Sequence, residues 1–285
     1  MNVDLHCHSC HSDGVLTPAV LAARASANGV ELWSLTDHDN MGGLDEARLH
    51  ACRLGMQFID GVEVSVSWQG VTVHIVGLAI DPSDRALDEG LARVRSGRDA
   101  RALRMAEALE RLGVRDAYAS AMRHADNPAL VGRSHFARVL VEQGYASDVH
   151  AVFRNYLVPG RPGYVEHSWT TLAQAVAWIR GAGGVAVIAH PGRYRLSGAQ
   201  IEQLFREFRA LGGLGIEVVS GSHGETEVHT FARLARTFGF YASCASDFHA
   251  PGESAVDLGC CARLPDDVEP IWRVPALAEL IACTT

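Results

Sequence analysis

The chain has 285 residues, of which 48% are hydrophobic, and a formal net charge of −8. A chain of this length can bury a full core without a disulfide framework, and its acidic balance argues against a general nucleic-acid-binding protein. The longest apolar run, Gly183 to Ala189, is too short to cross a bilayer, and the N-terminus does not resemble a secretion leader. Seven cysteines without a regular spacing indicate reduced thiols, so we expect a cytoplasmic protein with no membrane partner.

The first part of the chain alternates short apolar strands with helices. Thr17 precedes Pro18 and a run of helix formers, which is the order typical of a helix cap and first turn. The predicted strands cover 3–6, 31–36 and 56–66, and the predicted helices cover 18–28 and 43–54. Gln69-Gly70 indicates a hairpin turn between strands 62–68 and 71–80. Strands that alternate with helices favour a parallel sheet with one antiparallel exception.

The segment 82–160 differs from the rest of the chain. It has helical periodicity, many Arg residues and no convincing strand, so we predict an inserted helical subdomain. After it, predicted helices cover 171–182, 199–211 and 225–238, and predicted strands cover 184–189, 214–219 and 241–246. This order predicts a barrel-like α/β domain, formed by 1–81 and 161–285, with the helical segment as its cap.

Imidazole and carboxylate side chains stand at the predicted strand ends, the edge of a barrel that carries the chemistry. His6-Cys7-His8 ends the first strand, and Asp247-Phe248-His249 ends the last. Residues two apart on extended backbone face the same side, so each pair can reach one ion. Between these pairs, the same pattern places His38, Glu63 and His190 at strand ends, with His74 on the hairpin.

This set of side chains is difficult to explain by core packing. A single His near a strand end is more often an ordinary core or surface residue. Several His and acids on successive strand ends would bury unpaired charge, which is costly unless a metal compensates it. Mixed imidazole and carboxylate ligands suit Mn, Fe or Zn, and a pair of such ions is a common clamp for phosphoester hydrolysis. We therefore predict two or three divalent metal ions, with Mn favoured over Fe or Zn.

Several short motifs together carry a family resemblance. In chain order they are His6-Cys7-His8-Ser9, Ser12-Asp13-Gly14, Thr36-Asp37-His38-Asp39, Gly61-Val62-Glu63, His74-Ile75-Val76-Gly77, His190-Pro191-Gly192 and Ser246-Asp247-Phe248-His249. They resemble the motifs of the polymerase-and-histidinol-phosphatase (PHP) superfamily. The resemblance implies a distorted (β/α)7 barrel and a trinuclear metal centre. The implied ligands are His6, His8, Glu63 and Asp247 for one ion, Asp13, His38 and His249 for a second, and Glu63, His74 and His190 for a third.

Two further segments resemble one branch of that superfamily. They are Gly132-Arg133-Ser134-His135-Phe136-Ala137-Arg138 and Arg161-Pro162-Gly163-Tyr164-Val165. They are similar to the branch of nucleoside 3′,5′-bisphosphate phosphatases and 5′-3′ exoribonucleases, which implies a nucleotide substrate with a 5′-phosphate. Arg133, Ser134 and Arg161 would hold the phosphate that does not react, since guanidinium forks match phosphate oxygens. His135 and His223 are predicted to line the same pocket.

The predicted enzyme removes the 3′-phosphate of a nucleoside 3′,5′-bisphosphate, for example converting adenosine 3′,5′-bisphosphate to AMP. In this hypothesis, a hydroxide shared by two ions attacks phosphorus, and the predicted catalytic residues are Asp247, His190 and Arg193. Three alternatives stay open: a 5′-3′ exoribonuclease acting on short RNA, a histidinol phosphate phosphatase, and a non-catalytic metal-binding accessory module. The expected partner is a nucleotide or a short RNA and not a stably bound DNA. The oligomeric state is left open.

Overall fold

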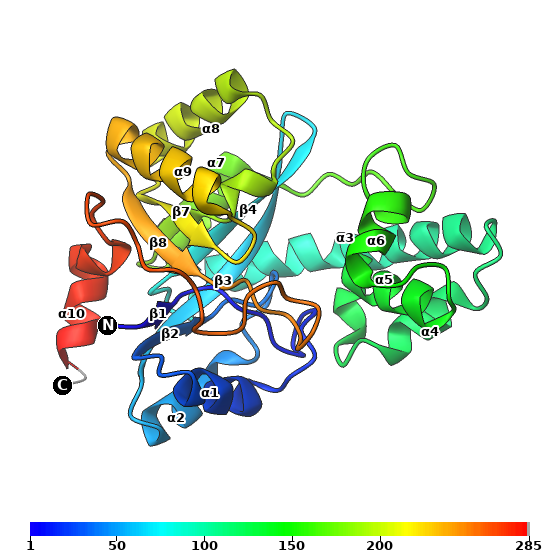
Figure 1. Cartoon of the computed structure of the whole chain (residues 1–285), viewed down its shortest axis with the longest axis horizontal. Helices are drawn as coiled ribbons and strands as arrows, with labels where there is room; N and C mark the ends of the chain where they lie inside the picture. Colours follow the sequence, from blue (N-terminus) through cyan, green and yellow to red (C-terminus); the bar gives the residue numbers. More distant parts are fainter. Residues whose placement is uncertain (284–285) are drawn as a thin grey trace.

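The computed structural model describes residues 1–283 of the chain. A curved sheet forms its centre, with the strands along the main path in the order β1, β2, β3, β4, β6, β7, β8, while the short β5 pairs with β3 (Figure 1). The strands are β1 Val3–Asp4, β2 Leu32–Leu35, β3 Gln57–Trp68, β4 Val71–Leu78, β5 Thr170–Thr171, β6 Val185–Ile188, β7 Gly215–Ser220 and β8 Tyr241–Ala245. The pairs β3–β4 and β4–β6 are antiparallel, and the other pairs are parallel.

The first and last strands lie beside each other and nearly close the sheet. Leu5 N donates to Cys244 O at 3.1 Å, and His8 N donates to Phe248 O at 2.8 Å. A parallel bridge joins Cys7 to Phe248 between these bonds. The result is a nearly closed barrel of seven strands, which confirms the predicted α/β barrel.

The hairpin between β3 and β4 forms at the predicted turn. Gln69 has φ 47° and Gly70 has φ 77°, so both central residues are in the left-handed region that a two-residue hairpin turn requires. Trp68 and Val71 are the last paired residues of the hairpin. The predicted antiparallel exception in the sheet is therefore present.

Helices cover the outside of the barrel (Figure 1). These are α1 Pro18–Ala27, α2 Leu44–Arg53, α7 Leu172–Gly181, α8 Gly198–Ala210, α9 Glu225–Phe238 and α10 Pro275–Cys283, with short helices η3 Pro191–Arg193 and η4 Ile271–Arg273. Thr17 caps α1 as predicted, since its hydroxyl accepts from Val20 N at 3.4 Å. Trp33, Phe205 and Phe208 are fully buried between these helices and the sheet. Among the described residues, no helix is both long enough and apolar enough to cross a membrane.

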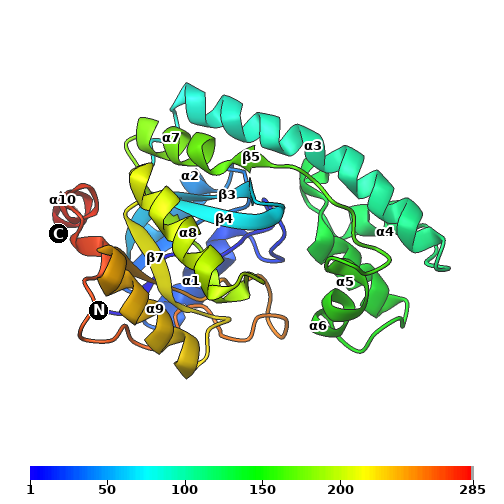
Figure 2. The ribbon, with the colours of Figure 1, turned by 90° about the horizontal axis from the view of Figure 1, so that it is seen from above.

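The segment that follows β4 forms the helical insertion, which we define as α3 Arg85–Glu110, α4 Ala117–Arg123, η1 Pro128–Leu130, α5 Arg133–Glu142, α6 Val149–Val152 and η2 Phe153–Leu157. Its core, which includes Leu109 and Phe136, is a cluster separate from that of the barrel. Figure 2 shows α3 passing beside α7 and continuing to α4, α5 and α6. Leu87 and Leu91 of α3 belong to the barrel core, and Met105 belongs to the insertion core. Residues of α3 therefore pack into both cores. The predicted domain boundary near residue 82 stays a prediction.

Candidate metal centre

All nine predicted metal ligands lie close together at one end of the barrel. Their donor atoms form overlapping groups, and within each group the atoms lie within 4.8 Å of one another. The groups are His8, Asp13, His38 and His249; His6, His190 and Asp247; His6, His8 and Glu63; and His38, Glu63 and His74. The sheet therefore gathers residues from both ends of the sequence into one cluster, which we call the metal-centre cluster.

Glu63 stands at the middle of this cluster and is fully buried. Its Oε1 lies 2.9 Å from His74 Nδ1 and 3.1 Å from His190 Nε2. Its Oε2 lies 2.7 Å from His38 Nδ1 and 3.3 Å from His8 Nε2. Each carboxylate oxygen thus faces its own set of imidazole nitrogens, so Glu63 could contribute to more than one metal site.

The prediction that Glu63 ends its strand was wrong, because β3 continues to Trp68. The extra residues pair with β4 in the hairpin, which extends past the end of β2. A single parallel bridge joins Glu63 to His38, just beyond the last residue of β2. Glu63 therefore lies at the edge of the barrel, although it lies inside its own strand.

Two aspartates complete the metal-centre cluster. Asp13 Oδ1 lies 3.3 Å from His249 Nε2, and Asp13 Oδ2 accepts from Ser134 Oγ at 2.7 Å. Asp247 Oδ1 lies 3.2 Å from His8 Nε2, and the other oxygen pairs with the half-exposed guanidinium of Arg193. The predicted catalytic Arg193 is thus held beside the cluster by one of its acids.

The donor set fits divalent metal ions. Asp13 Oδ1, Glu63 Oε2, His38 Nδ1 and His74 Nδ1 are buried atoms without a hydrogen-bond partner. Buried polar atoms normally have such a partner, so unsatisfied lone pairs that point at one another call for an ion. Imidazole and carboxylate donors without a thiolate suit transition ions such as Mn, Fe or Zn.

Glu217, in the middle of β7, was not among the predicted site residues. Its Oε1 lies 2.6 Å from His6 Nδ1, and its Oε2 accepts from His190 N at 2.7 Å. A proton on His6 Nδ1 leaves a lone pair on His6 Nε2, which points into the metal-centre cluster. Glu217 therefore fixes both the ring and the tautomer of His6. A single acid within an otherwise apolar predicted strand is the sequence signal that could have revealed it.

Burial and neighbouring charges set the protonation of the metal-centre cluster. Burial lowers the pKa of His8 to about 3 and the pKa of His74 to about 4, so both rings are neutral and offer lone pairs. Burial alone would raise the pKa of Glu63, but His74, His38 and His6 hold it well below its usual range. Burial alone would also lower the pKa of His6, His38 and His249, but neighbouring carboxylates raise it, to about 9 for His249. Metal binding at these rings would therefore displace protons.

The backbone is strained at the same place. Asp39, His190 and Asp247 have φ values of 50°, 27° and 53°, which non-glycine residues rarely adopt. Such conformations cost about 1–3 kcal/mol each and persist only where the surrounding structure enforces them. His190 and Asp247 belong to the metal-centre cluster, and Asp39 directly follows His38 of that cluster.

The insertion places α5 beside the metal-centre cluster. Ser134, in the first turn of α5, binds Asp13, and the Arg133 guanidinium lies 5.8 Å from the Phe153 ring. Burial lowers the pKa of Arg133. His135 is buried, and its Nδ1 accepts from Gly132 N at 3.0 Å, so its proton lies on Nε2, which has no partner.

The other predicted substrate residues lie elsewhere. Arg161 is exposed, and its guanidinium makes no hydrogen bond or ion pair with any residue in 1–283. His223 Nε2 accepts from Gly192 N at 3.1 Å, and its Nδ1 donates to Val218 O at 3.0 Å. Both nitrogens of His223 are thus engaged by the backbone, and the ring supports the turn that carries Arg193.

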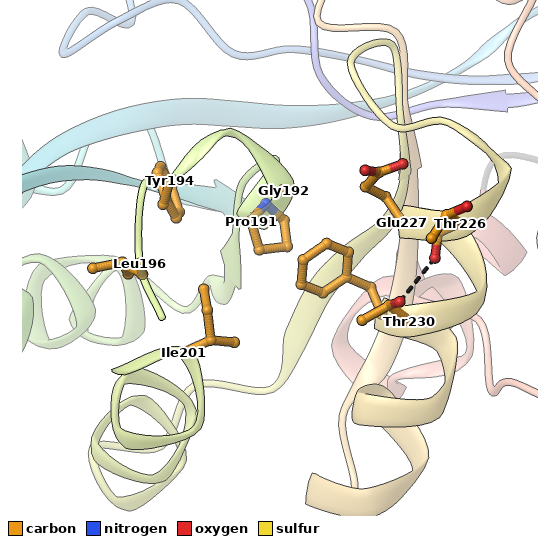
Figure 3. Close-up of a pocket in the computed structure, with 9 residues that line it drawn as sticks. Pro191, Gly192, Tyr194, Leu196, Ile201, Thr226, Glu227 and Thr230 are labelled. Atoms are coloured by element: carbon orange, nitrogen blue, oxygen red, sulfur yellow. Dashed lines mark hydrogen bonds between the residues drawn. The ribbon is translucent and has the colours of Figure 1, made fainter. Parts of the chain in front are cut away.

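A cavity of about 230 Å³ lies behind that turn (Figure 3). Pro191, Tyr194 and Leu196 line one side, and Thr226 and Glu227 of α9 face them. None of its lining residues belongs to the metal-centre cluster. The cavity is therefore a neighbour of the cluster and not part of it.

Comparisons with known proteins agree with this geometry. Residues 4–220 match the family model described as "PHP domain". The chain is 54% identical, over 95% of each chain, to a protein from Chromobacterium violaceum named 3′,5′-nucleoside bisphosphate phosphatase. It is 39% identical to a Haemophilus influenzae protein named 5′-3′ exoribonuclease, over 95% of this chain and 97% of that one. Its structure matches that of a Chromobacterium violaceum amidohydrolase with bound sulfate and no metal, with a TM-score of 0.94, 53% identity and coverage of 99% and 96%.

Proposed function

Because the chain belongs to the PHP domain family, we propose that it is a metal-dependent phosphatase that removes the 3′-phosphate from nucleoside 3′,5′-bisphosphates. The observation that carries the proposal is the metal-centre cluster around Glu63, with the partly buried guanidinium of Arg133 on the neighbouring α5. The cluster suits cations that act on one phosphate, and Arg133 suits a second phosphate on the same molecule. The relative with 54% identity carries the name of this activity.

The metal-centre cluster would hold the ions in three overlapping groups. The proposed ligands are His6, His8, Glu63 and Asp247 for the first ion, Asp13, His38 and His249 for the second, and Glu63, His74 and His190 for the third. Mn is the proposed metal, with Fe and Zn as alternatives. When bound, such ions polarise the phosphoryl group and activate water at neutral pH.

The side chains around the cluster orient the reacting phosphate. Arg193 is half exposed and is held by Asp247, so its guanidinium can turn toward a phosphoryl oxygen without leaving the site. It would neutralise the charge that develops on those oxygens. His190 would bind an ion, and the turn that begins at His190 carries Arg193. One short segment thus supplies both a metal ligand and a substrate contact.

The first turn of α5 would hold the other phosphate. Ser134 Oγ binds Asp13, so a substrate group at this turn lies next to a proposed metal ligand. Arg133 and the partnerless Nε2–H of His135 supply further donors at the same turn. Guanidinium and neutral N–H donors match the oxygens of a phosphate.

Phosphate release from adenosine 3′,5′-bisphosphate by Mn-loaded protein tests the proposal. The parallel substrates are a 5′-phosphorylated RNA oligomer and histidinol phosphate. We expect the bisphosphate to react fastest, with AMP as the product. Faster shortening of the oligomer would establish the exoribonuclease alternative, which the Haemophilus influenzae relative favours. Protein that binds metal but releases no phosphate from any substrate would contradict an enzymatic role.

A further inference from the structure

Arg101 on α3 is a buried cation without a counter-charge. Only 6% of its surface is exposed, yet no carboxylate among residues 1–283 pairs with its guanidinium. Its Nε donates to Val165 O at 3.2 Å, and its guanidinium lies 5.3 Å from the Trp169 ring. A carbonyl and an aromatic ring orient the side chain but do not cancel its charge, and an uncompensated buried cation is costly.

The other buried arginines of the insertion are neutralised. Arg98, one turn earlier on α3, is 8% exposed and pairs with Asp39, with a second bond to Ser65 Oγ at 3.0 Å. Arg138 on α5 is also 8% exposed and pairs with Glu253 at 2.9 Å. The contrast shows that the fold supplies an acid where an arginine is structural. Arg101 lacks one.

Arg98 and Arg101 both face the Trp169 ring, at 4.7 and 5.3 Å, and Arg98 also approaches Gly132, the residue before Arg133. Burial, together with the charges of Arg133 and Arg98, lowers the pKa of Arg101 to about 9, which leaves it protonated at neutral pH. Arg133 in turn lies within the field of Asp13 and Arg193, at the metal-centre cluster. Tyr164 is close enough to act on both guanidinium groups. Arg133 is therefore within electrostatic range of both Arg101 and Arg193.

We propose that Arg101 and Arg133 together bind the phosphate that does not react, with Arg101 in the role that the sequence suggested for Arg161. The inference rests on the proposed function. A phosphate dianion would supply the counter-charge that both guanidinium groups lack. Its oxygens would also accept the hydrogen bonds that each guanidinium can donate. Arg161, by contrast, is exposed to water, where a single phosphate contact contributes little.

Kinetics of Arg101→Met and Arg101→Lys test this assignment. The substrates are adenosine 3′,5′-bisphosphate and adenosine 3′-monophosphate, which lacks the phosphate in question. For Arg101→Met we expect kcat/KM on the bisphosphate to fall about 10- to 100-fold, mainly through KM, and to stay within about twofold on the monophosphate. Arg101→Lys should recover part of the loss, because it restores the charge without the fork.

Arg104→Met is the matched control, since Arg104 lies on the same helix and is exposed. Arg104→Met should change kcat/KM for neither substrate. An equal loss on both substrates for Arg101→Met, accompanied by a lower Tm, would show that Arg101 only supports the fold and would overturn the proposal. An equal effect of Arg104→Met would also overturn it, because general surface charge would then explain the result.

A binding measurement keeps the inference separate from the proposed function. Calorimetry with AMP, which retains the 5′-phosphate, should give a Kd about 10- to 100-fold weaker for Arg101→Met than for the wild type. If the wild-type protein failed to hydrolyse the bisphosphate, the proposed function would be wrong. The Kd for AMP would still test whether Arg101 binds the phosphate. An unchanged Kd would overturn the role of Arg101 even in an active phosphatase.

Discussion

The barrel end and the helical insertion bury charge of opposite sign. At the barrel end, four carboxylates are buried beside the imidazoles of the metal-centre cluster: Glu63, Asp13, Asp247 and Glu217. In the insertion, Arg101 is buried without an acid. Each region matches one part of the proposed complex: the carboxylates of the barrel suit cations, and the arginines of the insertion suit a phosphate. In the proposed complex, the two regions are complementary halves of one site.

Specific contacts fix the position of the helical insertion relative to the barrel end. Ser134 Oγ of α5 donates to Asp13, and Arg138 donates to Asp13 O at 2.9 Å. Arg98 of α3 pairs with Asp39, the residue after His38. The insertion is therefore fastened to the same loops that carry metal ligands, so the spacing between the two charge sites is fixed by protein contacts.

The comparison predicts that damage to the barrel end affects every substrate. Glu63→Gln keeps the size of the side chain but removes the charge that faces both sets of imidazoles. We expect loss of turnover on the order of 10³-fold or more on bisphosphate and aryl phosphate alike, together with reduced metal content by elemental analysis. Asp60 is a partly buried acid on the same strand, and Asp60→Asn should leave turnover and metal content nearly unchanged. Full activity in the Glu63 variant would rule out a bridging role.

Glu217→Gln should lower metal binding and turnover on every substrate, but by less than Glu63→Gln. The contact with His6 loses its charge, so metal affinity and turnover should fall about 10- to 100-fold. The loss should be equal for all substrates and should be recovered in part by excess Mn. Glu202→Gln, a half-exposed acid on α8, serves as the control. A loss confined to the bisphosphate would place Glu217 in substrate recognition instead.

Damage to the insertion should be selective. Arg133→Met should lower kcat/KM for the bisphosphate about 10- to 100-fold and change aryl phosphate hydrolysis by less than about threefold. Arg154→Met, an exposed arginine of the insertion, should have no effect on either substrate. Equal losses on both substrates in the Arg133 variant would break the division of labour between the two regions.

Most of the fold follows from local sequence signals. The predicted helix 225–238 has the observed bounds of α9, because Gly224 precedes it and Gly239, with φ 68°, ends it. The first strand is shorter than predicted, since the chain beyond Asp4 bonds to Cys244 of β8 and then bridges Phe248. The short β5 and the C-terminal α10 were missed. A strand of two residues has no periodicity to detect, and α10 follows an irregular segment without a clear start.

The site was less predictable where contacts span long distances in the sequence. The metal-centre cluster was found because its residues carry motifs at strand ends. Glu217 was missed because its partner, His6, lies 211 residues away and no local motif connects them. Arg101 and Arg104 look alike on an Arg-rich helix, and only tertiary packing buries the first and exposes the second. Burial of a charge is a property of the fold and cannot be read from the residue type.

The closure of the barrel by its first and last strands also sets the order in which the protein can mature. His6 and His8 are synthesised first, but Asp247 and His249, which complete their ligand groups, leave the ribosome only near the end of translation. At bacterial or eukaryotic elongation rates, the interval is on the order of tens of seconds. Metal loading at the full site must therefore follow synthesis of the whole barrel, and a nascent chain that stops before β8 exposes its imidazoles to any available ion.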